Sequence, residues 1–166
     1  MTKATQVTLI NTQGIGDRQF KYNTPAMEAI EAGDVIVDDS PTETRLATPA
    51  DANVKILRLA EEKRFGQFEL EQYTQATTLK GYEVGDIVEG YVPSHDNIWG
   101  VNVYNATGAP VDLAPGQKFT LSGDVNGKLA VAVAFTTVGI TPYQLSKAIT
   151  IPATSSALAD CFYIGQ

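Results

Sequence analysis

His95 is the only histidine of the 166-residue chain, and it stands next to Asp96. A Ser-His-Asp hydrolase brings three groups together in space, and its serine often sits in a Gly-x-Ser-x-Gly turn, which this sequence lacks. Neighbouring side chains of an extended segment point apart, so Asp96 is poorly placed to orient His95. We interpret His95 as an exposed loop residue and predict that the protein is not an enzyme.

Metal-binding residues are few and scattered. One His and one Cys cannot form a zinc site, so any metal site would have to consist of carboxylates. The densest group of carboxylates is Asp34, Asp38, Asp39 and Glu43. Its centre, Asp38-Asp39-Ser40-Pro41, is more typical of a solvated turn. Asp124-Val125-Asn126-Gly127 begins like a calcium loop but lacks the later ligands. We predict no metal site.

Other reactive groups give no signal for a cofactor. Gly14-Ile15-Gly16 has no third glycine three residues later, as a dinucleotide-binding fingerprint requires. Cys161 is the single cysteine, so no disulfide can form within the chain. Its apolar neighbours indicate a small buried hydrophobic residue. We predict no cofactor.

The charge of the chain excludes some partners and suggests others. A net charge of −7 and a pI near 4.6 disfavour nucleic acid and anionic membranes, which bind clusters of Lys and Arg. Residues 1–83 carry 9 Lys/Arg and 13 Asp/Glu, whereas residues 84–166 carry 3 and 6. A weakly charged half indicates contact with other chains. The alternative is that uncharged polar residues simply replace charge on its surface.

Three glycine-containing segments mark the beginnings of β-strands. Two of them are Ala32-Gly33-Asp34-Val35 and Val84-Gly85-Asp86-Ile87, and Pro115-Gly116-Gln117-Lys118 is a looser third. Glycine can adopt a positive φ, and the polar residue after it can bond to the backbone of the turn. With 22 Gly and Pro residues in the chain, this pattern predicts an all-β fold.

Alternating apolar residues predict where the strands lie. We expect strands over 54–60, 67–73, 87–92, 99–104, 118–122, 128–135 and 157–164. Asn126-Gly127 predicts the hairpin between the strands at 118–122 and 128–135. Residues 94–97 and 105–108 are expected to be turns or loops.

Helix signals are few. Thr24-Pro25 and Thr48-Pro49 each combine a capping residue with proline at the first helical position, so each predicts a short helix, the first over 24–30. The segment 54–60 fits both periodicities, and a helix over 50–63 is the alternative to a strand. Residues 1–23 are expected to form an extended N-terminal arm, with an edge strand as the alternative, followed by a single β-rich domain over 24–166.

The aromatic residues Tyr91, Trp99 and Tyr104 lie on predicted strands, where aromatic side chains most often serve as core or interface anchors. A sugar-stacking platform is the alternative. In the predicted arm, Phe20 and Tyr22 alternate on one face, and Val7 and Leu9 alternate in a possible short strand. The candidate interface residues are therefore Val7, Leu9, Phe20, Tyr22, Tyr91, Trp99 and Tyr104.

The stretch from Gly81 to Pro93 resembles the decoration, or cement, proteins of tailed-bacteriophage capsids. These proteins share a Val-Gly-Asp-hydrophobic strand start, here Val84-Gly85-Asp86-Ile87, then a second glycine-containing strand start at 115–119. A hairpin running into an Ala/Val strand follows at 127–132, and a short terminal strand at 158–164. The resemblance covers about residues 80–165, and the long polar stretch 136–157 departs from it.

The resemblance implies a mainly β fold, a small β-barrel or β-tulip-like domain with one or two short helices and an extended N-terminal arm. It implies a structural virion protein, made in the host cytoplasm, that binds the outer face of the capsid. The partners would be the major capsid protein and other copies of the chain, as a trimer or alternatively a dimer. The rival functions are a carbohydrate- or host-surface-binding β-module and another virion part, such as a tail-tube or head-completion protein.

Overall fold

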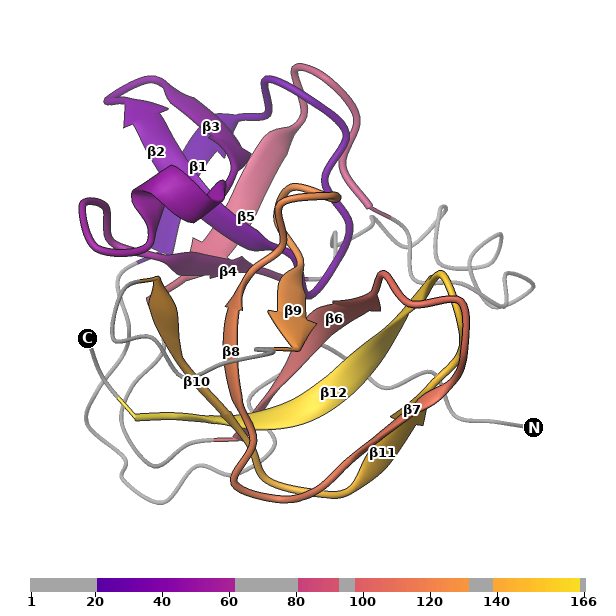
Figure 1. Cartoon of the computed structure of the whole chain (residues 1–166). Coiled ribbons are helices and arrows are strands. Elements are labelled where there is room, and N and C mark those ends of the chain that lie inside the picture. The colour runs from indigo at the N-terminus through magenta and orange to yellow at the C-terminus, as the bar shows by residue number, and fades with distance from the viewer. Residues whose placement is uncertain (1–20, 62–80, 93–97, 132–138, 165–166) are drawn as a thin grey trace, which may run out of the picture.

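The computed structural model describes residues 21–61, 81–92, 98–131 and 139–164, and of residues 21–23 it describes the backbone. Most of these residues lie in β-strands (Figure 1). The one helical element in the described ranges is the 3₁₀ helix η1 (Pro49–Asp51), which confirms the short helix predicted after Thr48. The mainly β fold predicted from the glycine turns and the alternating strands is confirmed, and so is the small barrel that the resemblance implied.

Five strands from the first part of the chain form one antiparallel sheet in the order β1-β5-β4-β2-β3. Its strands are β1 (Lys21–Pro25), β2 (Val35–Ser40), β3 (Glu43–Leu46), β4 (Arg58–Ala60) and β5 (Ile87–Tyr91). The two outer strands approach each other, because Ala26 and Thr44 form a bridge and the Met27 N–H donates to the Thr44 carbonyl at 2.9 Å. The sheet is therefore strongly curled.

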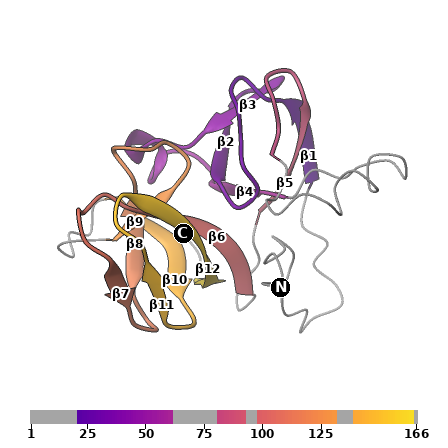
Figure 2. The ribbon, with the colours of Figure 1, turned by 90° about the vertical axis from the view of Figure 1, so that its right-hand side faces the viewer.

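Five later strands close into a barrel in the order β10-β12-β6-β9-β8. They are β6 (Ile98–Asn105), β8 (Lys118–Leu121), β9 (Leu129–Val131), β10 (Ile140–Leu145) and β12 (Ser155–Tyr163). The longest pairing joins β6 and β12, from Asn105 opposite Ser155 to Ile98 opposite Phe162. A two-stranded ribbon of β7 (Val111–Leu113) and β11 (Ile149–Ile151) lies at one end of the barrel (Figures 1 and 2).

The sheet and the barrel share one hydrophobic core. Val35 and Leu59 of the sheet belong to the same buried cluster as Trp99, Val101 and other barrel residues. Backbone hydrogen bonds also join the two units: the Asn102 N–H donates to the Gly33 carbonyl at 2.8 Å. The described parts of the predicted domain over 24–166 are therefore packed together through a common interior.

The three predicted glycine turns are built alike. Gly33, Gly85 and Gly116 have φ angles of 90°, 86° and 88°. In each turn the residue after the glycine donates its N–H to the carbonyl three residues earlier, at 3.1 Å, 3.0 Å and 3.2 Å respectively. The Asp34 and Asp86 carboxylates accept the N–H of the first turn residue, at 2.9 Å and 2.7 Å. The conformational role predicted for these glycines is confirmed.

Most strand predictions within the described ranges are also confirmed. They correspond to β5, β6, β8 and β12, and the hairpin at Asn126-Gly127 joins β8 to β9. The strand predicted over 128–135 is described only as far as residue 131. The strand predicted over 67–73, the loop with His95 and the arm up to residue 20 lie outside the described residues.

Two local predictions are wrong. The helix over 24–30 does not form, because Thr24 and Pro25 are the last residues of β1 and pair with Val88 and Ile87 of β5. Proline has no N–H to donate, and the end of an outer strand tolerates this loss. The strand expected over 54–60 is limited to β4 (Arg58–Ala60). The alternative helix over 50–63 is not seen in the described part of that range, residues 50–61, because η1 ends at Asp51 and β4 follows.

Candidate functional site

Only part of the predicted interface set, Tyr22, Tyr91, Trp99 and Tyr104, lies within the described residues. Val7, Leu9 and Phe20 lie outside the described residues. The Tyr22 backbone lies in β1 opposite Gly90 of β5. Residues 21–23 thus belong to an outer strand of the sheet, which is the edge-strand alternative to an arm.

A sugar-stacking platform was only the alternative for Tyr91, Trp99 and Tyr104, and the structure places Trp99 in the core. Trp99 is only 2% exposed and belongs to the shared core, with its ring centroid 5.8 Å from that of Tyr91. Tyr104 is five residues further along the same strand, so its side chain leaves from the opposite face. Trp99 thus anchors the interior and presents no surface to a sugar or to another protein.

Three carboxylates of the group Asp34, Asp38, Asp39 and Glu43 have different partners in the fold. Asp38 accepts a hydrogen bond from the buried Arg58, and Asp39 accepts one from Arg45 at 2.8 Å. Asp34 is buried between the sheet and the barrel. In the part of the chain that the structure describes, no group of three His, Cys, Asp or Glu residues could hold a metal ion.

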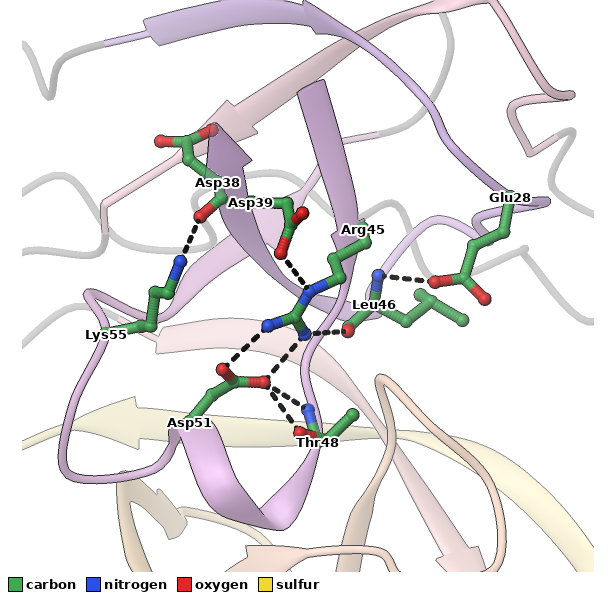
Figure 3. Close-up of polar contacts among 8 residues, drawn as sticks. All are labelled: Glu28, Asp38, Asp39, Arg45, Leu46, Thr48, Asp51 and Lys55. Atoms are coloured by element: carbon green, nitrogen blue, oxygen red, sulfur yellow. Dashed lines mark hydrogen bonds and ion pairs between the residues drawn. The ribbon is translucent and has the colours of Figure 1, made fainter. Parts of the chain in front are cut away.

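Arg45 and Asp51 form a polar network that fixes the chain around η1 (Figure 3). Two guanidinium nitrogens of Arg45 donate to the Asp51 carboxylate at 2.8 Å and 2.9 Å. The same carboxylate accepts the N–H and the hydroxyl of Thr48, both at 2.8 Å. The hydrogen bonds from Arg45 hold the pKa of Asp51 well below its usual range. This network anchors the beginning of the loop that follows η1.

That loop forms one wall of a groove of about 400 Å³. Lys55 fixes the loop to the sheet, because its Nζ donates to the Asp38 carbonyl at 2.9 Å (Figure 3). The groove is lined by Ala52, Asn53, Val54, Lys55, Ile56, Ile140, Thr141 and Ile164. It therefore lies where the loop after η1 meets the beginning of β10 and the residue after β12.

The groove is rich in exposed apolar side chains. Val54 is 80% exposed and Ile56 is 65% exposed, and Ile164 is also exposed. Phe162 is exposed two residues before Ile164, so the two side chains leave the same face of the chain. We call Val54, Ile56, Phe162 and Ile164 the groove patch. Exposed apolar side chains that gather at one place are typical of binding surfaces.

A second group of exposed apolar side chains lies at the turn before β5. Val84 is 71% exposed at the second position of the turn, and Ile87 and Met27 are exposed beside it. The Gly85 N–H donates to the Ala26 carbonyl at 2.8 Å, which places Met27 next to this turn. We call Met27, Val84 and Ile87 the turn cluster.

Sequence reasoning missed both groups. One signal was available for the turn cluster: the second position of each glycine turn is Ala32, Val84 or Pro115, and only Val84 is a large aliphatic residue. Such a position in an exposed turn leaves the side chain without neighbours. No comparable signal marked the groove patch, because Val54 and Ile56 fitted a buried strand equally well.

Replacing Asp51 with alanine should destabilise the protein by about 2 kcal/mol, because Arg45 and Thr48 lose a shared acceptor. Urea unfolding measures the change. The matched control is Asp39→Ala, which removes a more exposed acceptor from the same guanidinium and should cost less than about 1 kcal/mol. Because the pKa of Asp51 is lowered in the folded state, its stabilising effect should be lost as the pH falls below the usual Asp range. Equal effects of the two substitutions would contradict this account of the network.

None of the helical residues described forms a segment long and apolar enough to cross a membrane. A comparison with protein-family models finds no match for the chain. A comparison with curated proteins finds no relative either. The likeness to capsid decoration proteins therefore stays a prediction from the sequence pattern.

Proposed function

We propose that the chain is a structural virion protein, without enzymatic activity, that binds the outer surface of a tailed-phage capsid and bridges major capsid subunits. The observation that carries this proposal is the distribution of charge over the fold. Residues 21–61, which supply four strands of the curled sheet, carry 4 basic and 8 acidic residues. Residues 98–164, which supply the whole barrel and the ribbon, carry 3 basic and 3 acidic residues.

A weakly charged barrel is suited to contact with a large protein surface. Burying a charged side chain requires removing its water, so interfaces that bury few charges avoid this cost. Of the six charged residues in 98–164, Lys128 is already buried within the chain. The acidic sheet would then face solvent and, being negatively charged, would not attract nucleic acid.

Attachment to a shell does not require a strong single contact. A copy that touches two neighbouring capsid subunits at once gains from the high effective concentration of the second site. Many weak bridges across a lattice would together stabilise the assembled shell. The predicted partners are the major capsid protein and further copies of this chain, at the outer face of the virion.

The direct test is co-sedimentation of the purified protein with capsids of the phage or prophage whose genome encodes it, prepared without this protein. We expect saturable binding at a fixed number of copies per shell, and electron microscopy should place the barrel against the shell. Removing residues 2–20 tests the remaining part of the predicted arm by the same measurement. Absence of saturable binding to those capsids would overturn the proposed function.

The two rival functions now differ in their support. The carbohydrate-binding module relied on Trp99 as a stacking surface, and Trp99 is buried. Another virion part, such as a tail-tube or head-completion protein, remains an alternative that solution mass tests. A ring-forming protein of that kind should be a hexamer or larger, whereas the decoration protein is expected to be a trimer or a dimer.

A further inference from the structure

Within the described ranges, exposed large apolar side chains occur in two groups. Seven large hydrophobic residues in the described ranges are exposed, and all seven belong to the groove patch or to the turn cluster. Elsewhere in these ranges the large hydrophobic side chains are buried or half-buried. Two separate apolar surfaces on one chain allow the first surface of one copy to bind the second surface of another copy.

The two surfaces have opposite shapes. The groove patch borders a hollow, whereas the turn cluster surrounds a turn whose glycine has no neighbours: a Cβ added at Gly85 would meet nothing within 4 Å. In Figure 1 the turn before β5 lies at the top of the curled sheet, and the loop after η1 lies at the left, between the sheet and the barrel. Figure 2 also shows the two segments apart, so they cannot meet within one chain.

The two surfaces also have opposite charges. Among the described residues that line the groove, Lys55 is the one charged residue and none is a carboxylate. The turn carries Glu83 and Asp86 and no basic residue. Glu83 is exposed beside Val84, so an apolar side chain and a carboxylate leave the turn together. The turn therefore matches the groove in its apolar surface, its shape and its charge.

We propose that the turn at 83–87 of one copy of this chain binds in the groove of a second copy. Val84 and Ile87 would pack against Val54 and Ile56, with the Glu83 carboxylate on the side of Lys55. Since a specific contact needs roughly 800 Å² per partner, the turn and groove form the apolar centre of a wider interface. The two surfaces differ, so the contact runs head to tail and either closes into a ring or propagates. A ring of three would leave no turn or groove uncovered.

Sedimentation equilibrium over a concentration series tests the contact. We expect wild-type protein to associate, and Ile56→Asp and Val84→Asp each to weaken association by at least about tenfold, because each places a carboxylate in the apolar centre. Both side chains are exposed, so circular dichroism and the urea midpoint should match those of wild type at concentrations where all the proteins are monomeric. The matched control is Ser156→Asp, which adds a carboxylate at an exposed position outside both surfaces and should associate like wild type.

Mixing the two variants distinguishes a head-to-tail contact from a symmetric one. Ile56→Asp retains an intact turn, and Val84→Asp retains an intact groove. Each variant alone should associate at least about tenfold more weakly than wild type, whereas an equimolar mixture should form a heterodimer with one intact contact. If each surface instead met its own copy, both variants would associate alone through the surface that they retain.

Four results would overturn the proposal: a monomeric wild type, association of either variant alone as strong as wild type, loss of association in Ser156→Asp, or no heterodimer in the mixture. The proposal does not depend on the capsid function. Co-sedimentation with shells tests that function separately. Self-association without binding to shells would contradict the capsid function alone. Binding to shells by a monomeric protein would contradict the turn–groove contact alone.

Discussion

Gly127→Ala should destabilise the protein by roughly 3 kcal/mol. Gly127 has a φ of 75°, a conformation that costs an L-amino acid about 1–2 kcal/mol. A Cβ at this position would lie 2.5 Å from Leu46 Cδ2, and overpacking of this kind costs about 1–3 kcal/mol. Both costs arise at once, since the backbone cannot rotate to relieve the contact without losing its hydrogen bonds.

Those hydrogen bonds tie the curled sheet to the barrel. The Gly127 N–H donates to the Ala47 carbonyl at 2.8 Å, and the Gly127 carbonyl accepts the Val35 N–H at 2.6 Å. Urea unfolding of the variant measures the loss. Gly108→Ala is the matched control, because a Cβ at Gly108 meets nothing within 4 Å, and its effect should stay within about 0.5 kcal/mol. Equal midpoints for the two variants would contradict the role assigned to Gly127.

Asp34→Asn should change the pH dependence of stability. Asp34 lies between the sheet and the barrel, where its Oδ1 accepts a hydrogen bond from Asn102 at 2.8 Å and lies 3.5 Å from Lys128 Nζ. Burial raises the pKa of this carboxyl to about 6 from its ordinary value of 3.8, although Lys128, Asn102 and the Glu31 N–H favour its ionised form. The nearby Glu31 carboxylate adds to the increase.

The sign of the effect follows from the raised pKa. The folded chain binds the proton more tightly than the unfolded chain, so the stabilisation from Asp34 is complete below pH 3.8 and is lost as the pH rises through about 6. The loss is on the order of 3 kcal/mol for this difference in pKa. The asparagine side chain of the variant cannot ionise, so the stability of the variant should lack this decrease.

Urea unfolding from about pH 4 to about pH 7 measures the difference between wild type and Asp34→Asn. The free energy of unfolding of wild type, relative to that of Asp34→Asn, should decrease across this range by most of the roughly 3 kcal/mol given above. Asp124→Asn, which replaces an exposed carboxylate in the loop between β8 and β9, is the control. An unchanged difference between wild type and Asp34→Asn at all pH values would show that Asp34 does not titrate there.

The parts of the fold that the sequence predicted are those that depend on local geometry. The turns at Gly33, Gly85 and Gly116 need only a residue that accepts a positive φ, followed by a strand. The hairpin around Asn126-Gly127 and the alternation in β12 are equally local. Their prediction required no knowledge of which strand pairs with which.

The errors arose where pairing partners decide the structure. Thr24-Pro25 has the local signature of a helix start, but pairing with β5 holds it in a strand. Val54 and Ile56 fit a strand by pattern, yet pairing begins only at Arg58, which leaves both side chains exposed. Trp99 fitted either a core or a surface role, and the approach of the sheet to the barrel buried it. The candidate binding surfaces are therefore products of the tertiary arrangement, and only Val84 could have been suspected from its turn position.

The burial of Trp99 has a practical consequence for spectroscopy. It is the only tryptophan in the chain, and its ring contacts Tyr91 of the sheet while its backbone belongs to the barrel. Its fluorescence emission should therefore be blue-shifted in the native protein and move to longer wavelength when water enters between the two units. Separation of the sheet from an intact barrel would thus be visible without any added dye.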